Sequence, residues 1–417
     1  MKTWTLTRRS FARASITVLA AATLPRLAFS EPAHDVSSEE DFDELWHTLK
    51  ERYCFFQDKH TDWDQVRALY RPLAIAAETD DAYMAVLGQV LNELYDAHTQ
   101  LSNAPDGTQC GPFYDLLVER VDAGTQGAIR IKAIRDGSAA TDAGLVIGDL
   151  ITEIDGQPID HVVQVLMPKC LSTPDPTADV YTINVAASGR RGQARRFTVV
   201  SHHHHPREVQ LPFKKWVEQP NIESKRLDDD IGYIVIRSFA DNAVLDTFDR
   251  ALSDFRDTRG LIIDVRNNGG GDTAIAKPIM GRFISKPLPY ALMRRRDGKE
   301  LSDPWTEILE PRGPFTYTQP VVVLTSHWSA SMAEGFPMGM RGIGRATIVG
   351  TPMMGLGAAV FQIHLDRTGI QAQYSGEPVY DVQDRPRWQM RPDVEVPYGG
   401  DILAAGIKTL KKTLVPV

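Results

Sequence analysis

The chain has 417 residues, of which 42% are hydrophobic and 24% are charged, a composition that is ordinary for a globular protein. This length suits two or three domains and allows a sizeable core without disulfides or structural metal. The formal net charge is −8, so nucleic acid and anionic lipid are poor candidates for partners because both are polyanions.

The first 30 residues form a separate segment with five Lys or Arg residues and no acid. An apolar stretch at 16–24 is too short to span a bilayer, and the small residues Ala28 and Ser30 suit cleavage before Glu31. Residues 7–11 carry a twin-arginine pattern, although an ordinary Sec signal with a chance arginine pair is the alternative. We predict a bacterial signal peptide at 1–30 and a periplasmic or secreted protein of net charge −13, with no membrane span after cleavage.

The next segment, residues 31–105, is predicted to be a helical cap. Phe42, Leu45, Leu49 and Tyr53 recur at helical spacing, and two further helices are expected around 63–70 and 83–94. The last of these helices is expected to end near residues 95–99.

Residues 106–200 show a strand, a turn, a short helix, a glycine turn, a strand and a tight Asp-Gly turn. This order and spacing resemble a PDZ domain, with a generic small β-rich domain as the alternative. The resemblance implies that the domain holds an extended peptide, often by its C-terminal carboxylate, through addition to a sheet edge.

A linker with irregular structure is predicted at 201–227. It contains four adjacent histidines, 202–205, which cannot all face one metal ion, so we predict no metal site there. The cysteines Cys54, Cys110 and Cys170 match no zinc or redox motif. One pair could form a disulfide in an oxidising compartment, and the spacing does not say which.

Residues 228–417 are predicted to form an α/β core. Apolar strands are expected at 231–236, 260–266 and 320–324, with a helix around 244–255 and two more strands at 358–365 and 369–375. Continuous apolar strands that alternate with helices are typical of a sheet covered by helices.

Ser331 is the candidate nucleophile of this core. It follows the buried strand at 320–324 and stands at the head of a predicted helix. A serine in such a turn projects from a rigid element and faces the positive end of the helix, whose N–H groups can stabilise an oxyanion. A simple helix cap would also explain one serine at this position.

A second loop, residues 268–271, contains three consecutive glycines after the strand at 260–266. Glycines let the backbone approach a substrate closely and present its N–H groups. The spacing imitates a dinucleotide-binding fingerprint, but that motif needs an acid about twenty residues later. Residues 273–296 contain no acid, so we do not predict a nucleotide cofactor.

Four segments together resemble the C-terminal processing (tail-specific) peptidase family, which includes the tricorn core. They are residues 264–271, 329–334, 349–357 and 391–393. The resemblance implies a ClpP/crotonase-like α/β core with a helical cap and an inserted PDZ domain, and no metal or organic cofactor. It also implies Ser331 as nucleophile and an oxyanion hole formed by the N–H of Met332 and a glycine of the Gly270–Gly271 pair.

Leu356 departs from the family pattern, because many members carry a lysine base at this position. Leucine cannot accept a proton, so another base is required. Relatives without the lysine, the tricorn-like branch, use a cap histidine within a segment that resembles residues 94–99 here. The resemblance therefore implies His98 as base, unless that histidine is only structural; His327 is the rival.

A late carboxylate should orient the base, with Glu377 as first candidate and Asp384 as second. Glu334, one helical turn after Ser331, is expected to support the loop. The predicted function is an exported serine peptidase that acts on a peptide or protein substrate. The alternatives are a catalytically inactive protein that binds peptides through the PDZ domain and an esterase on the same fold.

Overall fold

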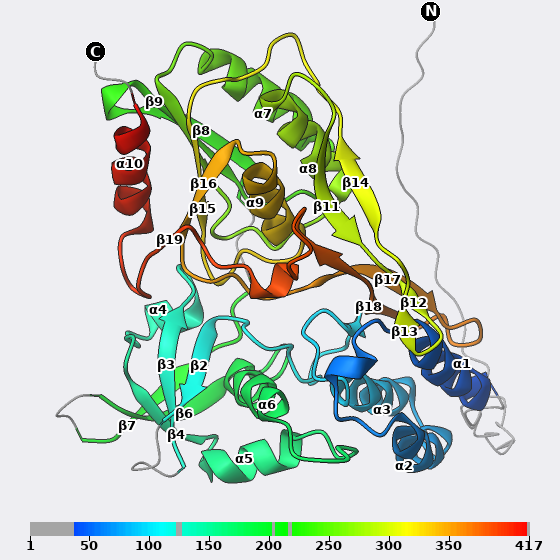
Figure 1. Cartoon of the computed structure of the whole chain (residues 1–417). Coiled ribbons are helices and arrows are strands. Elements are labelled where there is room, and N and C mark those ends of the chain that lie inside the picture. Colours follow the sequence, from blue (N-terminus) through cyan, green and yellow to red (C-terminus); the bar gives the residue numbers. More distant parts are fainter. Residues whose placement is uncertain (1–36, 122–126, 202–204, 216–218, 415–417) are drawn as a thin grey trace, which may run out of the picture.

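The computed structural model describes residues 37–121, 127–201, 205–215 and 219–414. The predicted signal peptide and most of the histidine run lie outside these ranges. Figure 1 shows the helical cap and the PDZ domain side by side beneath the α/β core. Within the described residues, no helix combines the length and the apolar character that a membrane crossing requires.

Three helices form the cap, as predicted: α1 (Ser37–Arg52), α2 (Trp63–Ile75) and α3 (Asp80–Asn92). The side chains of Asp62 and Thr79 accept hydrogen bonds from the first turns of α2 and α3, which sets where these helices begin. The apolar faces pack into one cluster that also takes in Ile363 and Tyr374 of the core. This shared cluster holds the cap on the core.

The PDZ domain is an antiparallel sheet in the order β2-β3-β4-β6-β7, with the short β5 paired to β4. Three helices accompany this sheet (Figure 1). Its elements are β2 (Leu116–Arg120), β3 (Ile129–Ile134), α4 (Ala139–Asp142), β4 (Leu150–Ile154), β5 (Gln157–Pro158), α5 (Ile159–Leu166), α6 (Pro176–Ser188), β6 (Arg195–Val200) and β7 (Arg207–Leu211).

The core contains a six-stranded sheet in the order β19-β16-β15-β10-β9-β8, parallel except for β8. One face packs on α7, α8 and α9, and the other face packs on α10. The elements are β8 (Ile222–Leu227), β9 (Ile231–Ile236), α7 (Ala243–Asp254), β10 (Gly260–Asp264), α8 (Thr273–Met280), β15 (Val321–Thr325), α9 (Met332–Gly342), β16 (Ala346–Gly350), β19 (Val394–Glu395) and α10 (Ile402–Thr413).

A second sheet joins the core to the cap (Figure 1). Its path is β1-β18-β11-β14, and β17 also pairs with β18. Its strands are β1 (Gln100–Leu101), β11 (Leu288–Met293), β14 (Trp305–Leu309), β17 (Ala358–His364) and β18 (Gln371–Tyr380), and a small hairpin of β12 (Arg296–Asp297) and β13 (Glu300–Leu301) lies nearby. The cap contributes β1, so it and the core share backbone hydrogen bonds.

The prediction of an irregular linker at 201–227 was wrong in its structural content. β7 lies in this range and pairs with β6 as the last strand of the PDZ sheet, and β8 pairs with β9 in the core sheet. Each strand satisfies its backbone groups by pairing with the strand next to it in the sequence. The three cysteines are buried free thiols, so no pair of them forms a disulfide in this structure.

Asp41 of α1 provides a test of how the cap is held. Its carboxylate accepts hydrogen bonds from the backbone N–H groups of Arg367 (3.0 Å) and Thr368 (2.7 Å), which follow β17. We expect Asp41→Ala to lower the free energy of unfolding by about 2 kcal/mol, because two bonds to a buried charged group are lost. Denaturant unfolding measures this change.

Glu40, the residue before Asp41, supplies the matched control. Its carboxylate pairs with the Arg367 side chain, and both side chains remain largely exposed. Glu40→Gln should change the free energy of unfolding by less than about 0.5 kcal/mol. Equal effects of the two substitutions would contradict the anchoring role of Asp41.

Candidate active site

Ser331 occupies the turn between β15 and α9, at the head of the helix as predicted. Its backbone lies at φ 55° and ψ −118°, outside the regions that residues other than glycine readily adopt. Such a conformation persists only when its surroundings enforce it, and it is common at functional sites. The carbonyl of Ser331 accepts the N–H groups of Glu334 and Gly335, which fixes the serine to the first turn of α9.

The glycine loop lies directly beside this turn, because β10 and β15 are parallel neighbours whose ends meet at one edge of the sheet. Ser329 Oγ donates to the Val265 carbonyl at 2.7 Å, and the Ala330 N–H donates to the Asn268 carbonyl at 3.0 Å. The Asn268 side chain donates to the carbonyl of Ile236 in β9 at 3.1 Å. Three strands therefore hold the two loops against each other.

Gly270 makes the closest approach to the serine. A Cβ at this position would lie 2.8 Å from the Cβ of Ser331 and 3.0 Å from the backbone nitrogen of Met332. At Gly271, a Cβ would lie 2.4 Å from the carbonyl carbon of Phe239. Both residues also have positive φ angles, 105° and 134°. Only glycine fits at either position.

The backbone donors near Ser331 differ in availability. The N–H of Gly270 is already bound to Asn268 Oδ1 at 2.7 Å. Among the described residues, no hydrogen-bond acceptor is found for the N–H of Gly271 or for that of Met332. These two groups are the ones that remain free to receive an oxyanion.

Glu334 lies one turn along α9 and is fully buried. Its Oε1 accepts the N–H groups of Gly355 (2.8 Å) and Leu356 (3.0 Å). Burial raises the pKa of this carboxyl to about 7, although Arg387 and the backbone N–H groups oppose the rise. Glu334 therefore ties the serine helix to the segment that carries Leu356.

Arg387 is the cation that faces Glu334, and its side chain is buried as well. Its Nε lies 3.8 Å from Glu334 Oε2, and its guanidinium donates to the carbonyls of Leu356 (2.5 Å) and Ala358 (3.1 Å). The backbone around Leu356 is thus held from both sides, by a carboxylate at its N–H and by a guanidinium at its carbonyl. Sequence reasoning missed Arg387, because no local motif marks it.

His98 lies between α3 and β1 and is 6% exposed. Asp96 accepts the backbone N–H of His98 at 3.0 Å, and Gln373 of β18 donates to the His98 carbonyl at 2.9 Å. The pKa of the ring is lowered to about 4, mainly by burial; Arg387 adds to the fall, whereas Asp96 and a backbone hydrogen bond with Ala358 oppose it. The imidazole is therefore neutral at physiological pH, as a proton acceptor must be.

No hydrogen bond joins His98 to Ser331 among the contacts of the described residues, and His98 Nδ1 has no partner. The serine helix and His98 both contact the segment 356–358. Glu334, one turn from the serine, holds the N–H of Leu356, while the His98 ring interacts with the backbone of Ala358.

The proposed orienting acids are engaged elsewhere. Glu377 of β18 lies 3.5 Å from Arg295, and burial raises the pKa of its carboxyl. Asp384 forms a two-pronged pair with Arg294 at 2.7 and 2.8 Å. The carboxylate of Asp96 binds the backbone N–H of His98, and its charge opposes the fall in the pKa of the ring; the sequence marked Asp96 only as part of the histidine segment.

His327, the rival base, faces the PDZ domain. Its ring packs edge-on against Phe113 with centroids 4.6 Å apart, and the neighbouring Trp328 donates from its indole to the Phe113 carbonyl at 3.1 Å. Burial lowers the pKa of His327 to about 3. These contacts give His327 a packing role at the boundary of two domains.

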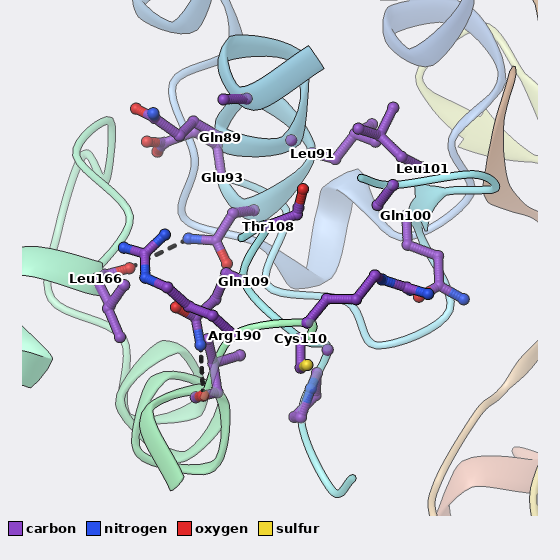
Figure 2. A pocket seen from close by; sticks show the side chains of 18 of the residues that line it. Gln89, Leu91, Glu93, Gln100, Leu101, Thr108, Gln109, Cys110, Leu166 and Arg190 are labelled. Atoms are coloured by element: carbon purple, nitrogen blue, oxygen red, sulfur yellow. Dashed lines mark hydrogen bonds between the residues drawn. The ribbon is translucent and has the colours of Figure 1, made fainter. Parts of the chain in front are cut away.

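A cavity of about 580 Å³ lies behind the His98 segment, between α3, residues 100–112 and the PDZ helices. Figure 2 shows Gln89 of α3 and Glu93 directly after it on one side, and Leu166 and Arg190 on another. Ser331 is not part of its lining. In the described part of the chain, no three His, Cys, Asp or Glu side chains gather in a way that could hold a metal ion.

Comparison with known proteins decides the family. Residues 230–396 match the model of peptidase family S41, residues 35–92 match the tricorn protease C1 domain, and residues 130–167 match a PDZ domain. The core of the chain, residues 230–396, therefore belongs to peptidase family S41. The predicted family, the α/β class and the PDZ domain are thereby confirmed.

Curated relatives of this S41 chain are distant. Carboxy-terminal processing protease CtpB of Bacillus subtilis is 30% identical over 137 residues, 32% of this chain and 27% of that protein. The carboxy-terminal-processing protease of Bartonella bacilliformis is 24% identical over 255 residues, 58% of this chain and 52% of that protein. Tricorn protease homolog 1 of Streptomyces coelicolor is 24% identical over 327 residues, 75% of this chain and 28% of that protein. The chain thus spans from about a quarter to about half of their lengths.

Two solved structures share the fold of this S41 chain. Mature CPAF has a TM-score of 0.60 at 16% identity, with 90% of this chain and 96% of that chain covered. The photosystem II D1 C-terminal processing protease has a TM-score of 0.55 at 18% identity, with 91% and 98% covered. Both similarities concern the fold alone.

Arg387 provides the test of this site's construction. We expect Arg387→Gln to lower the free energy of unfolding by about 3 kcal/mol, because the buried carboxylate of Glu334 would lose its cation. The midpoint and slope of denaturant unfolding measure this loss.

Arg385 is the matched control, since its side chain is 61% exposed and pairs with Asp381 nearby. Arg385→Gln should cost less than about 1 kcal/mol. A loss at Arg387 no larger than the loss at Arg385 would show that Glu334 does not depend on the buried cation.

Proposed function

We propose that this S41 chain is a serine peptidase that hydrolyses peptide bonds, with Ser331 as nucleophile and His98 as base. The observation that carries the proposal is the strained backbone of Ser331 at the head of α9, beside the free N–H groups of Gly271 and Met332. A nucleophile and two backbone donors at one point are the parts that acyl transfer needs.

In the proposed reaction, Ser331 Oγ attacks the scissile carbonyl carbon and its proton passes to the His98 ring. The oxyanion accepts hydrogen bonds from the N–H groups of Gly271 and Met332. The C–N bond then breaks, and His98 returns the proton to the leaving amine. A water molecule then attacks the acyl-enzyme and gives a proton to His98. The ester C–O bond breaks, and His98 returns the proton to Ser331 Oγ.

His98 is the proposed base because the other groups near Ser331 are poorly suited. Leu356 has no titratable group, and the guanidinium of Arg387 stays protonated even though burial lowers its pKa. The lysine-less, tricorn-like mechanism is therefore the one that this set of residues supports best. The ring has to approach Ser331 when substrate binds, as catalytic hydrogen bonds often shorten only in the complex.

The acid that orients the base belongs to the proposal as well. Asp96 is the strongest candidate, because its carboxylate binds the backbone N–H of His98 and its charge opposes the fall in the pKa of the ring. Glu377 and Asp384 would first have to leave Arg295 and Arg294. Glu334 supports the site by fixing the Leu356 backbone to α9.

The substrate is proposed to be a peptide or protein, whose C-terminal segment the PDZ domain could hold. Export through the segment at 1–30, to the periplasm or outside the cell, remains a prediction from the sequence. The inactive peptide-binding alternative draws support from Leu356 and from the lack of a Ser331–His98 hydrogen bond among the described contacts. The esterase alternative uses the same residues.

A serine-directed fluorophosphonate probe separates enzyme from scaffold. We expect covalent labelling of the wild type, none of Ser331→Ala and at least about 100-fold slower labelling of His98→Ala, because the neutral imidazole activates the serine. Mass spectrometry of the labelled protein provides the measurement. Hydrolysis of casein compared with small esters then separates peptidase from esterase.

Two exposed residues, Ser224 and His47, provide controls for the loss of a serine and of a histidine. Ser224→Ala and His47→Ala should label like the wild type. Labelling of Ser331→Ala at the wild-type rate, or no labelling of a folded wild type, would rule out the proposed nucleophile.

The pH dependence of kcat/KM tests the identity of the base. Because burial holds the pKa of His98 at about 4, the base stays neutral down to that pH. We expect the acid side of the profile to fall through about pH 4 rather than through the usual range of a histidine near 6.5.

Glu334, with a pKa of about 7, is the competing source of pH dependence. Glu334→Gln should leave the position of the acid-side fall unchanged. A wild-type fall centred near pH 7 that disappears in Glu334→Gln would assign the profile to Glu334 and contradict control by His98.

A further inference from the structure

The first strand of the PDZ domain, β2, forms one edge of its sheet. It pairs with β3 on one side and has no strand on the other among the described residues. An edge strand presents backbone N–H and C=O groups to any chain that lies beside it. PDZ domains use such an edge to add an extended peptide to the sheet.

In this chain the edge of β2 is already occupied by a side chain of α6. Asn184 Oδ1 accepts the N–H of Val118 at 2.9 Å, and Asn184 Nδ2 donates to the Val118 carbonyl at 3.1 Å. Asn184 is fully buried. One side-chain amide thus satisfies both backbone groups of Val118, in the way that the backbone of an added peptide would.

Two further contacts hold α6 against β2 and the residues just before it. The guanidinium of Arg120 donates two hydrogen bonds to Asp179 at 3.0 and 2.7 Å, and the N–H of Tyr114 donates to Ser188 Oγ at 3.2 Å. Asp179, Asn184 and Ser188 span most of the helix. Figure 1 shows α6 lying beside β2.

We propose that α6 is a latch that closes the peptide-binding edge of the PDZ domain, and that an extended peptide adds to β2 only after Asn184 leaves Val118. This inference rests on the proposed peptide substrate and names the regulation of its capture. A closed edge and an added peptide exclude each other, because both need the N–H and the carbonyl of Val118. Peptide affinity therefore depends on the fraction of molecules in which α6 is released.

The cavity of about 580 Å³ gives α6 room to move. Tyr181 and Val185 line it from α6, on the side of the helix adjacent to Asn184. Asp96 and Ala97 line it from the His98 segment. A helix that shifts into this space would move toward the loop that carries the proposed base, and it would give up part of its packing in the PDZ core, to which Ile183, Ala186 and Ala187 belong.

The test measures peptide binding in protein that cannot cleave the peptide, so Ser331→Ala is the parent for all variants. The probes are fluorescein-labelled hexapeptides that end in Ala, Val, Leu or Phe, each with a free or an amidated C-terminus. In Asn184→Leu and Asn184→Ala we expect free-carboxylate peptides to bind about tenfold more tightly by anisotropy, because the closed state loses two hydrogen bonds. Asp179→Asn should shift affinity in the same direction by a smaller factor.

Hydrogen exchange of the segment 116–120 gives a readout that needs no peptide. Both Asn184 variants should exchange the Val118 amide about tenfold faster than the parent, while β6 keeps its protection. Glu119→Gln is the matched control: Glu119 lies on the same strand, but it pairs with Arg130 and Lys132 of β3 rather than with α6. This control should leave both exchange and peptide affinity unchanged.

Slow exchange at 116–120 in folded Asn184 and Asp179 variants would overturn the latch, and so would equal peptide affinity in parent and variants. If an Asn184 variant does not fold, Asp179→Asn decides, since it loosens α6 at a partly exposed ion pair. Because every protein in this test lacks the nucleophile, failure of the latch is distinguishable from failure of the peptidase proposal.

Discussion

The contact between Gly270 and Ser331 is the constraint on which the rest of the site depends. Two parallel strands, β10 and β15, end side by side, and the loops that follow them must pass each other without a side chain between them. The missing Cβ of Gly270 allows that passage. The same close packing holds Ser331 in a conformation that it would not adopt alone, so the proposed nucleophile and the N–H groups proposed to bind the oxyanion are positioned together.

A buried ion pair holds the backbone around Leu356. Glu334 and Arg387 bind the N–H and the carbonyl of Leu356 respectively, so the backbone at this position is fixed although its side chain has no chemical role. Burying such a pair costs desolvation free energy. Removing one partner destabilises the protein strongly, because the other charge is left buried and unpaired. The low pKa of His98 comes mainly from burial, and the charge of Arg387 adds to it.

The sequence was most informative where function lies within one continuous segment. The strand, the small residues and the helix around Ser331 follow each other directly, and the glycines at 269–271 mark a turn by themselves. Arg387 has no such signal, because 56 positions separate it from Ser331 and only the packed core brings it to Glu334. The carboxylates Glu377 and Asp384 illustrate the same limit: their arginine partners come from the residues that directly follow β11.

The helix α6 escaped prediction for a different reason. Residues 182–188, the C-terminal half of the helix, are all buried, including the polar Thr182 and Asn184, so this half shows no apolar stripe of helical period. A buried stretch of helix has to satisfy its polar side chains inside the protein. Asn184 does so on the one edge of the PDZ sheet where a peptide would otherwise bind. The burial that hid α6 in the sequence is therefore the same feature that closes the domain.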